Sequence, residues 1–462
     1  MKKYIFIWIA SISFVFGFEY QLNGWAGSWT KVGFNIGNPK TIDPIKGVFP
    51  TESFSTMAIN LAADVQLYKW NTSSLNFGVS GFIGGLVYDS TKKDKTIDGQ
   101  LYVPAGFSYN YAGFWAGYLL NAPYSALEAG NYTHNIIIPM IYLHYNSEFF
   151  ELWAGRYNVP TSSYADLFSS YTQGVDLVFK YKYFRAFFEA SFGRANASMA
   201  WMYDWYAPYS VSDEKGEPTN LGMYFIGMDY IKDGLTIRPA FYFYPTLYNV
   251  PVLKVSYQTS QDFFEQRGWG SNTQFLLFTP FQLYNARYYP GGIGRYRYGD
   301  LPDKFAVSLT FLQTFNLDRY SFGFGFHKNF GSANGYVGNR GNTVLMADIW
   351  DASVYDIGQS VSDTIGADAF TPYLFGGAKY QNFEWNILGR LTYARRSNEQ
   401  ALRIGGSYNL KKDILLGGFI EFFRDETKAG YRVGSSRPVP GNPRNIADRS
   451  YMAVYIRYNF SN

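Results

Sequence analysis

Apolar and polar residues alternate along much of this chain of 462 residues. From Phe383 to Tyr393 the odd positions carry Phe, Trp, Ile, Gly, Leu and Tyr, whereas the even positions carry Glu, Asn, Leu, Arg and Thr. The same period of two recurs at 59–68, 320–327 and 402–410. Side chains of a strand point alternately to its two faces. The pattern therefore predicts β-strands with two different faces along the whole chain.

A continuous apolar stretch lies at the N-terminus. Lys2 and Lys3 precede the uncharged run from Tyr4 to Phe16, and Gly17 follows it. A basic start, a short apolar run and small residues before the cut are typical of a secretory signal peptide. We predict cleavage after Gly17, with small Val15 and Gly17 before the cut. A membrane anchor is the alternative, but the run is shorter than the roughly 20 residues that a membrane-spanning helix needs. The predicted mature chain is 18–462.

The rest of the chain has no apolar run that could span a membrane as a helix. An exported chain can still span the outer membrane if its strands close into a barrel, which satisfies every backbone polar group. A soluble β-sandwich alternates in the same way. Aromatic residues near strand ends, and short links that alternate with long polar ones, favour the barrel instead.

The last strand supports this interpretation. Residues 451–460 alternate and bring a phenylalanine to position 460, with Ser461 and Asn462 behind it. This ending resembles the C-terminal signal of Gram-negative outer-membrane proteins, which the barrel-assembly machinery would bind. The localisation that follows is the outer membrane.

The short links give a strand count. One strand near Glu19 precedes eight expected hairpins, and 451–460 follows them. A ninth hairpin, joining 252–259 to 273–284, is doubtful because its link is long for a turn. We therefore expect an all-β fold, a single antiparallel transmembrane β-barrel of about 18 strands (roughly 16 to 20), a size that encloses an aqueous channel. The eight expected turns are Asn71–Ser74, Tyr111–Gly113, Asn146–Glu148, Lys180–Lys182, Lys232–Gly234, Leu317–Arg319, Gln381–Asn382 and Lys411–Asp413.

Composition excludes several other classes of protein. The absence of cysteine excludes disulfides, thiolate metal sites and cysteine nucleophiles. An aromatic content of 20% is too high for a disordered chain. The net charge of +4 is too small to indicate a nucleic-acid partner.

Candidate catalytic residues are few. His134, His144 and His327 are the only histidines, and no two of them have the spacing of a zinc site. No Gly-x-Ser-x-Gly motif or phosphate-binding loop is present. We therefore expect no enzyme activity and no cofactor.

The segments 171–176 (YTQGVD) and 455–460 (YIRYNF), together with the Tyr- and Phe-rich strands, carry a family resemblance. The chain resembles the Helicobacter-type outer-membrane protein family called Hof, which is similar to the 18-stranded OprD-type porins and to the major outer-membrane porin of Campylobacter. The resemblance implies diffusion of small hydrophilic solutes or cations, and it allows a homotrimer.

Charged side chains on the face opposite the apolar one would line a pore. Rows of opposite charge would order dipolar solutes and set an ion preference. The alternative for each residue is an ion pair that only holds neighbouring strands together. Arg390, Arg403 and Arg457 lie on the last strands, where they could form a basic ladder as in OprD-type pores. The candidates are Arg185, Glu189, Arg238, Glu384, Arg390, Arg403, Glu421 and Arg457, with Asp64, Asp176 and Lys180 on the same face.

Two long links could narrow the pore. Residues 341–378 contain no Lys or Arg but carry five aspartates. Folded inward, such a loop would attract cations; a solvated extracellular loop and a calcium site are the alternatives, although no EF-hand spacing is present. A basic, Tyr-rich link at 287–297 would face this acidic loop or contact lipopolysaccharide phosphates. The five predicted constriction residues are Asp348, Asp351, Asp356, Asp363 and Asp368.

These observations favour an outer-membrane porin, a passive water-filled channel with a weak cation preference. One alternative is a substrate-specific channel for amino acids, peptides or metal complexes. The other is an adhesin that uses the barrel as an anchor and binds through its long loops.

Overall fold

The computed structural model describes residues 19–34, 51, 53–89, 136–158, 171–200, 202–206, 220–245, 248–260, 268–283, 303–333, 345, 363–432 and 435–461. The predicted signal peptide, the turn at Tyr111–Gly113 and the basic link at 287–297 lie outside these residues. Asp348, Asp351 and Asp356 lie outside them as well.

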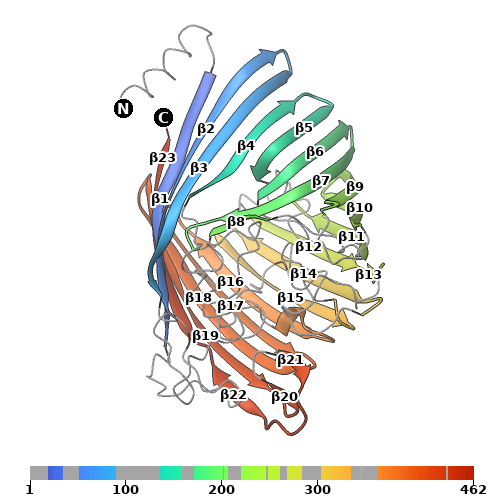
Figure 1. Cartoon of the computed structure of the whole chain (residues 1–462), viewed down its shortest axis with the longest axis vertical. Helices are drawn as coiled ribbons and strands as arrows, with labels where there is room; N and C mark the ends of the chain where they lie inside the picture. The colour runs from blue at the N-terminus through green and yellow to red at the C-terminus, as the bar shows by residue number, and fades with distance from the viewer. Residues whose placement is uncertain are drawn as a thin grey trace.

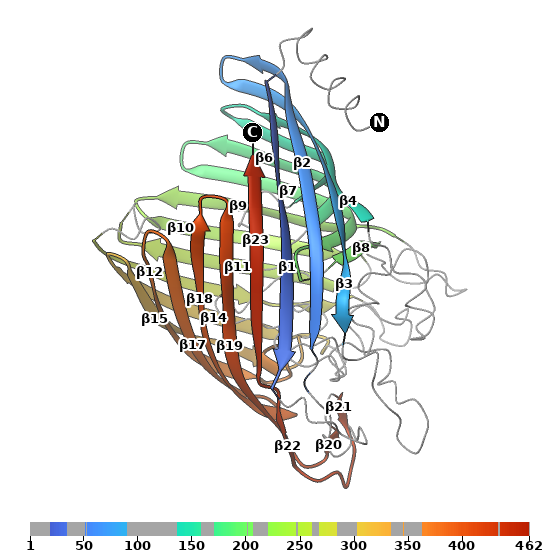
Figure 2. The same ribbon diagram turned by 90° about the vertical axis from the view of Figure 1, so that its left-hand side faces the viewer.

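Eighteen long strands of the described residues form the wall of a closed barrel (Figures 1 and 2). They are β1 (Glu19–Gly33), β2 (Phe54–Trp70), β3 (Ser73–Asp89), β4 (Ile136–Asn146), β5 (Phe150–Asn158), β6 (Tyr171–Tyr181), β7 (Phe184–Ala197), β9 (Met223–Lys232), β10 (Leu235–Tyr244), β11 (Tyr248–Gln258), β12 (Trp269–Phe278), β14 (Val307–Leu317), β15 (Tyr320–Phe330), β16 (Phe370–Lys379), β17 (Phe383–Tyr393), β18 (Ser397–Lys411), β19 (Ile414–Thr427) and β23 (Tyr451–Ser461).

Closure joins the first strand to the last. β1 pairs with β23 from Asn23↔Ser461 to Gly33↔Tyr451, and its other edge pairs with β2. Smaller elements extend the wall or stand beside it. They are β8 (Met202–Tyr206), β13 (Phe281–Gln282), β20 (Tyr431–Arg432), β21 (Ser435–Pro438), β22 (Asn445–Asp448) and the 3-10 helix η5 (Asp363–Ile365).

The short turns lie at the end of the barrel where β1 begins and β23 ends (Figure 2). In the β9–β10 turn Asp233 and Gly234 both have positive φ, 50° and 81°, as a tight two-residue hairpin requires. Seven of the eight expected hairpins are confirmed, and the doubtful ninth exists, because β11 pairs with β12. β3 pairs directly with β4, so the hairpin expected at Tyr111–Gly113 adds no strands between them in the wall. The β11–β12 hairpin takes its place in the count, and the total is again 18.

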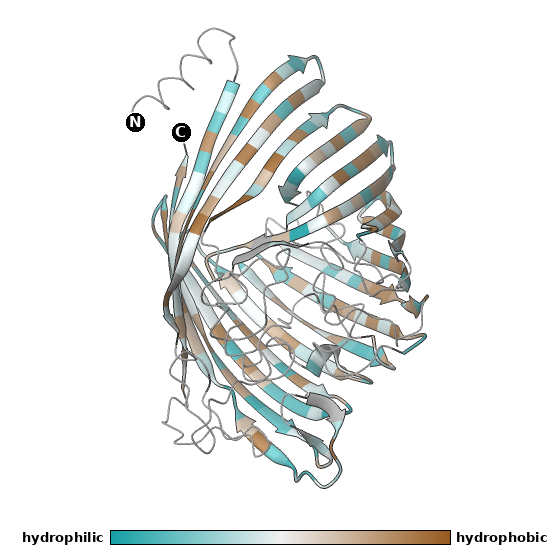
Figure 3. Cartoon of the chain, viewed as in Figure 1, coloured by the Kyte–Doolittle hydropathy of each residue, from teal (hydrophilic) through white to brown (hydrophobic). Residues whose placement is uncertain are grey.

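The two faces of the wall follow the alternation in the sequence (Figure 3). In β2, Met57, Ile59 and Leu61 are exposed on the outer face, whereas Thr56 and Ala58 are buried on the inner face. Within the described residues, no helix is long and apolar enough to cross a bilayer. Exposed aromatic side chains surround the short-turn end, as in the interfacial girdle of a membrane barrel; they include Trp70, Tyr181, Trp269, Tyr320 and Tyr408.

A hydrophobic cluster packs on the inner face from β6 to β16. Phe187 stacks on Phe225 with ring centroids 5.4 Å apart, and Tyr242 stacks on Tyr248 at 5.8 Å. Large aromatic side chains on the inside reduce the free cross-section of an 18-stranded barrel. The interior is therefore narrower than the strand number alone suggests.

Candidate pore lining

Polar side chains of β4, β5 and β6 meet on the inner face near the short-turn end. Glu151 accepts hydrogen bonds from Lys180 Nζ at 2.7 Å and from Trp153 Nε1 at 3.0 Å. The His144 ring stacks on Trp153 at 3.8 Å, and its Nε2 lies 3.3 Å from Glu151 Oε1. This network fixes His144 as part of the wall.

A row of cations continues from this network across β6, β7, β10 and β11. Lys180 faces Arg185 in register, and Arg238 faces Lys254. We call these four residues the basic row. Asp229, which lies opposite Arg185 on β9, binds Arg238 with two hydrogen bonds of 2.5 and 2.8 Å. Arg185 is half-buried, and its Nε has no hydrogen-bond partner among the described residues.

Two carboxylates lie further along the same strands. Asp176 on β6 and Glu189 on β7 are opposite each other, and both are fully buried. Neither carboxylate oxygen of Glu189 accepts a hydrogen bond within the described part of the chain. The predicted residue Glu189 therefore lies on the inner face, beside a second acid.

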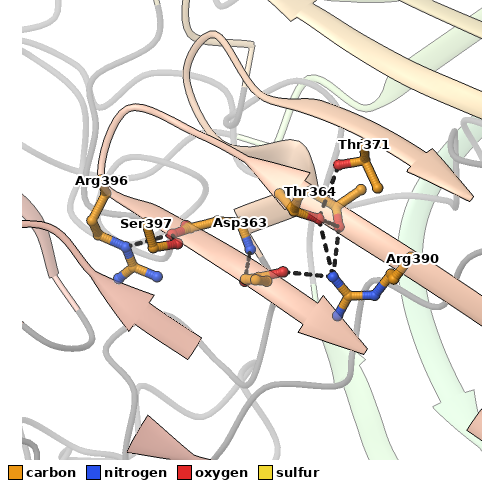
Figure 4. Close-up of polar contacts among 8 residues, drawn as sticks. Asp363, Thr364, Thr371, Arg390, Arg396 and Ser397 are labelled. Carbon is orange, nitrogen blue, oxygen red and sulfur yellow. Dashed lines mark hydrogen bonds and ion pairs between the residues drawn. The ribbon is translucent and has the colours of Figure 1, made fainter. Parts of the chain in front are cut away.

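The inner face of β17 and β18 holds a contrasting network (Figure 4). Arg390 and Glu399 are almost completely buried, and Arg390 Nη1 donates to Glu399 Oε2 at 2.6 Å. The backbone N–H of Asp363, at the start of η5, donates to Glu399 Oε1 at 2.6 Å. Arg396 Nε donates to Asp363 Oδ2 at 2.7 Å, and the Ser397 hydroxyl donates to the same oxygen. We call Asp363, Arg390, Arg396 and Glu399 the β17–β18 anchor.

Three threonines complete the contacts of this anchor. Arg390 Nη1 donates to Thr392 Oγ1 at 3.1 Å and lies 3.5 Å from Thr364 Oγ1. Thr371 donates to Thr392 at 3.0 Å. These bonds attach η5, the end of the acidic link, to the inside of the wall.

Arg403 forms a second matched pair, with Glu421 on β19. Its Nε and Nη2 both bind Glu421 Oε2, at 2.7 and 2.6 Å, and its guanidinium lies 4.3 Å from the Phe419 ring centroid. Tyr451 on β23 lies within 3.3 Å of Arg403 Nη2. Glu384 and Arg457 also have the inward parity, and Arg457 Nε has no hydrogen-bond partner among the described residues.

The expected ladder of Arg390, Arg403 and Arg457 is therefore not an uninterrupted basic row, because Glu399 and Glu421 pair with its first two members. The basic row lies instead on β6 to β11. Alternation did not identify Lys254 as an inward-facing charge, because it lies in the doubtful hairpin of β11 and β12. It could not identify Arg396 either, because Arg396 lies in the turn between β17 and β18.

Both described aspartates of the acidic link are paired with arginines. Asp363 binds Arg396, and Asp368 binds Arg395 Nη2 at 2.6 Å. Hydrogen bonds from Arg395 and from the Gly331 N–H lower the pKa of Asp368 below its ordinary value. The negative charges of these two carboxylates are therefore largely balanced by the arginines bound to them.

The described residues contain no group of three or more potential metal ligands. His327, on the inner face of β15, is fully buried and lies 2.7 Å from Thr310 Oγ1 through Nδ1. Asn329 Oδ1 lies 3.1 Å from its Nε2. Both ring nitrogens thus have polar neighbours in the wall.

Solved structures of three bacterial proteins share this architecture. OccK9 of Pseudomonas aeruginosa is 11% identical with a TM-score of 0.62, over 96% of this chain and 98% of that chain. OccAB4 of Acinetobacter baumannii is 10% identical with a TM-score of 0.60, over the same shares. OprD of P. aeruginosa is 9% identical with a TM-score of 0.56, over 96% and 95%. At these identities the likeness shows the fold.

No curated protein sequence matches the chain. A family model described as "Putative outer membrane protein", of Helicobacter type, matches residues 5–460, which is nearly the whole chain. The chain belongs to this family of outer-membrane proteins.

Proposed function

We propose that the chain is an outer-membrane porin, a passive channel for small hydrophilic and charged solutes. The observation that carries this proposal is the basic row on the inner face of β6 to β11, with Glu151 and Asp229 beside it. Charged groups on a low-dielectric wall create a field in the lumen that attracts and orders charged solutes. A closed barrel of this size provides the path.

The weak cation preference stays a prediction, and the structure describes two of the five aspartates behind it. Asp363 and Asp368 are paired with Arg396 and Arg395. The preference would therefore depend on Asp348, Asp351 and Asp356, acting against the basic row.

Single-channel conductance of the refolded protein in a planar bilayer, with a salt gradient, tests both the channel and its cation preference. Large ohmic steps are expected, with a reversal potential of the cation-selective sign. Changing Asp348, Asp351 and Asp356 together to Asn should move that potential toward anion selectivity. Changing Asp363 and Asp368 to Asn should move it less. A protein that migrates as folded on a gel yet gives no steps would contradict the channel.

A solute-selective channel is the second candidate. It is favoured by the β17–β18 anchor, because a segment fixed on the inside of the wall leaves less room for solutes. Liposome swelling with neutral, anionic and cationic amino acids of similar size distinguishes the two candidates. Rates that follow size alone support the general pore, and rates that differ by charge at equal size support the selective channel.

A further inference from the structure

A groove of about 980 Å³ lies on the outer face of the barrel, over β15 to β19 and β22. Its lining is mostly apolar, and the outward side chains among its lining residues open it toward the membrane. Leu374 and Phe422 are among the most exposed of these side chains. The main lining residues are Phe324, Leu374, Gly389, Leu402, Phe422 and Ile446.

Gly389, on β17, contributes no side chain to the lining of the groove. In register, Gly389 stands between Leu374 on β16 and Leu402 on β18. A Cβ atom at Gly389 would meet only Leu402 Cδ1, at 3.9 Å. The position therefore has room for a side chain, and its absence leaves the hollow between the flanking leucines.

One end of the groove is polar. Arg424 on β19 and Asp448 on β22 lie opposite each other at this rim, toward the long-loop end of the strands. Asp448 accepts a hydrogen bond from the Ser450 N–H at 2.8 Å. Arg424 is exposed, and none of the ion pairs among the described residues includes it, although its charge acts on nearby Glu426. The neighbouring cations Arg395 and Arg444 are both paired, with Asp368 and Glu426.

An apolar hollow that ends at an exposed guanidinium matches the shape of an amphiphile with an anionic head. In barrels with short turns on one side, the long-loop side faces the outer leaflet. Guanidinium groups bind phosphates with paired, charge-assisted hydrogen bonds. We propose that this groove binds a phosphate-bearing acylated lipid of the outer leaflet, with its acyl chains over Gly389 and its phosphate on Arg424.

The test uses the folded full-length protein in detergent and native mass spectrometry, with diphosphorylated lipid A as the probe and phosphatidylcholine as the zwitterionic reference. Arg424→Gln should weaken lipid A binding about tenfold, as expected for loss of one strong charge-assisted contact. Gly389→Leu should weaken the binding of both lipids, since its side chain fills the hollow.

Gly376→Leu is the matched control. Gly376 lies on the same outer face but is not part of the groove, and a Cβ there has no neighbour closer than 3.8 Å. This variant should bind lipid A like the wild type. If Gly389→Leu fails to fold, two measurements still test the proposal. They are lipid A binding by Arg424→Gln and the comparison of lipid A with phosphatidylcholine.

Two results would overturn the proposal. One is equal lipid A binding by the wild type, Arg424→Gln and Gly389→Leu. The other is a lipid-free dimer or trimer that Gly389→Leu dissociates and Gly376→Leu leaves intact, because the occupant would then be a second copy of the chain.

Discussion

Two sides of the barrel use inward-facing arginines in different ways. On β16 to β19 each arginine has a carboxylate of its own: Arg390 has Glu399, Arg396 has Asp363, and Arg403 has Glu421. On β6 to β11 the basic row has four cations, and the ion pairs found there join Lys180 to Glu151 and Arg238 to Asp229. The first side is a matched set, whereas on the second the Nε of Arg185 has no hydrogen-bond partner among the described residues.

The difference shows that an inward-facing charge can have either of two roles. A buried charge with a bonded counter-charge fixes strands and loops, and it contributes little net field to the lumen. In a channel such as the one proposed, a half-buried charge without such a partner would act on solutes in the lumen. The following variants test whether this division holds.

The largest effect is expected in the β17–β18 anchor. Arg390→Met leaves Glu399 buried without its partner, which should lower the free energy of unfolding by about 3–5 kcal/mol. Arg390→Met combined with Glu399→Leu removes both charges and should cost much less. Urea unfolding in lipid vesicles measures the free energy of unfolding of the wild type and of both variants. A double variant as unstable as the single one would show that the pair is not the source of the stability.

A smaller, local effect is expected from Asp363→Asn. This change removes the charge that holds Arg396 and Ser397, at a cost of about 1–3 kcal/mol, so η5 should detach from the wall more often. Hydrogen exchange at the amides of Asp363 and Gly366 should become faster. Asp368→Asn is the control, because its pair with Arg395 is half exposed and should leave these amides protected.

Ion selectivity should respond on the other side of the barrel. Arg185→Glu should shift the reversal potential toward cations, with cation permeability rising about sixfold. Two charges roughly 8 Å apart in water interact by about 0.5 kcal/mol, and reversing one of them changes that interaction by about 1 kcal/mol. Arg403→Gln with Glu421→Gln removes a matched pair without changing the net charge, so it should cause almost no shift. A larger shift from this double variant than from Arg185→Glu would reverse the assignment of the two sides.

The smallest effect concerns acid pH. The pKa of Asp368 is lower in the folded protein than the unfolded value of about 3.9. Its stabilisation is therefore fully present above that value and is lost as the pH falls through the folded pKa. Because the pair is half exposed, it should contribute less than about 1 kcal/mol.

Asp368→Asn checks this prediction. Asparagine tolerates the positive φ of 56° at this position, so the backbone need not change. The melting temperatures of variant and wild type should differ slightly at pH 6, and the difference should shrink as the pH falls from about 4 toward about 2. A constant difference over that range would show that the Asp368 carboxylate is not responsible.

Much of the wall could be predicted because strand alternation is a local property. The strands around Ile59 and Phe322 and the two-residue turn at Asp233 need only neighbouring residues to be recognised. The β11–β12 hairpin was doubtful because its connection is long, and strand pairing across a long link depends on the rest of the sheet. The direct pairing of β3 with β4 was missed for the same reason.

The sequence by itself determined an aromatic-rich barrel of about 18 strands and the inward face of the charges on the strands it identified, because both follow from a period of two. Only the tertiary structure decided which charges meet. Arg390 and Glu399 are diagonal neighbours on adjacent strands, and Asp363 reaches them from a separate segment. Such contacts depend on register and on how a link folds back, and neither is encoded in the alternation of a single strand.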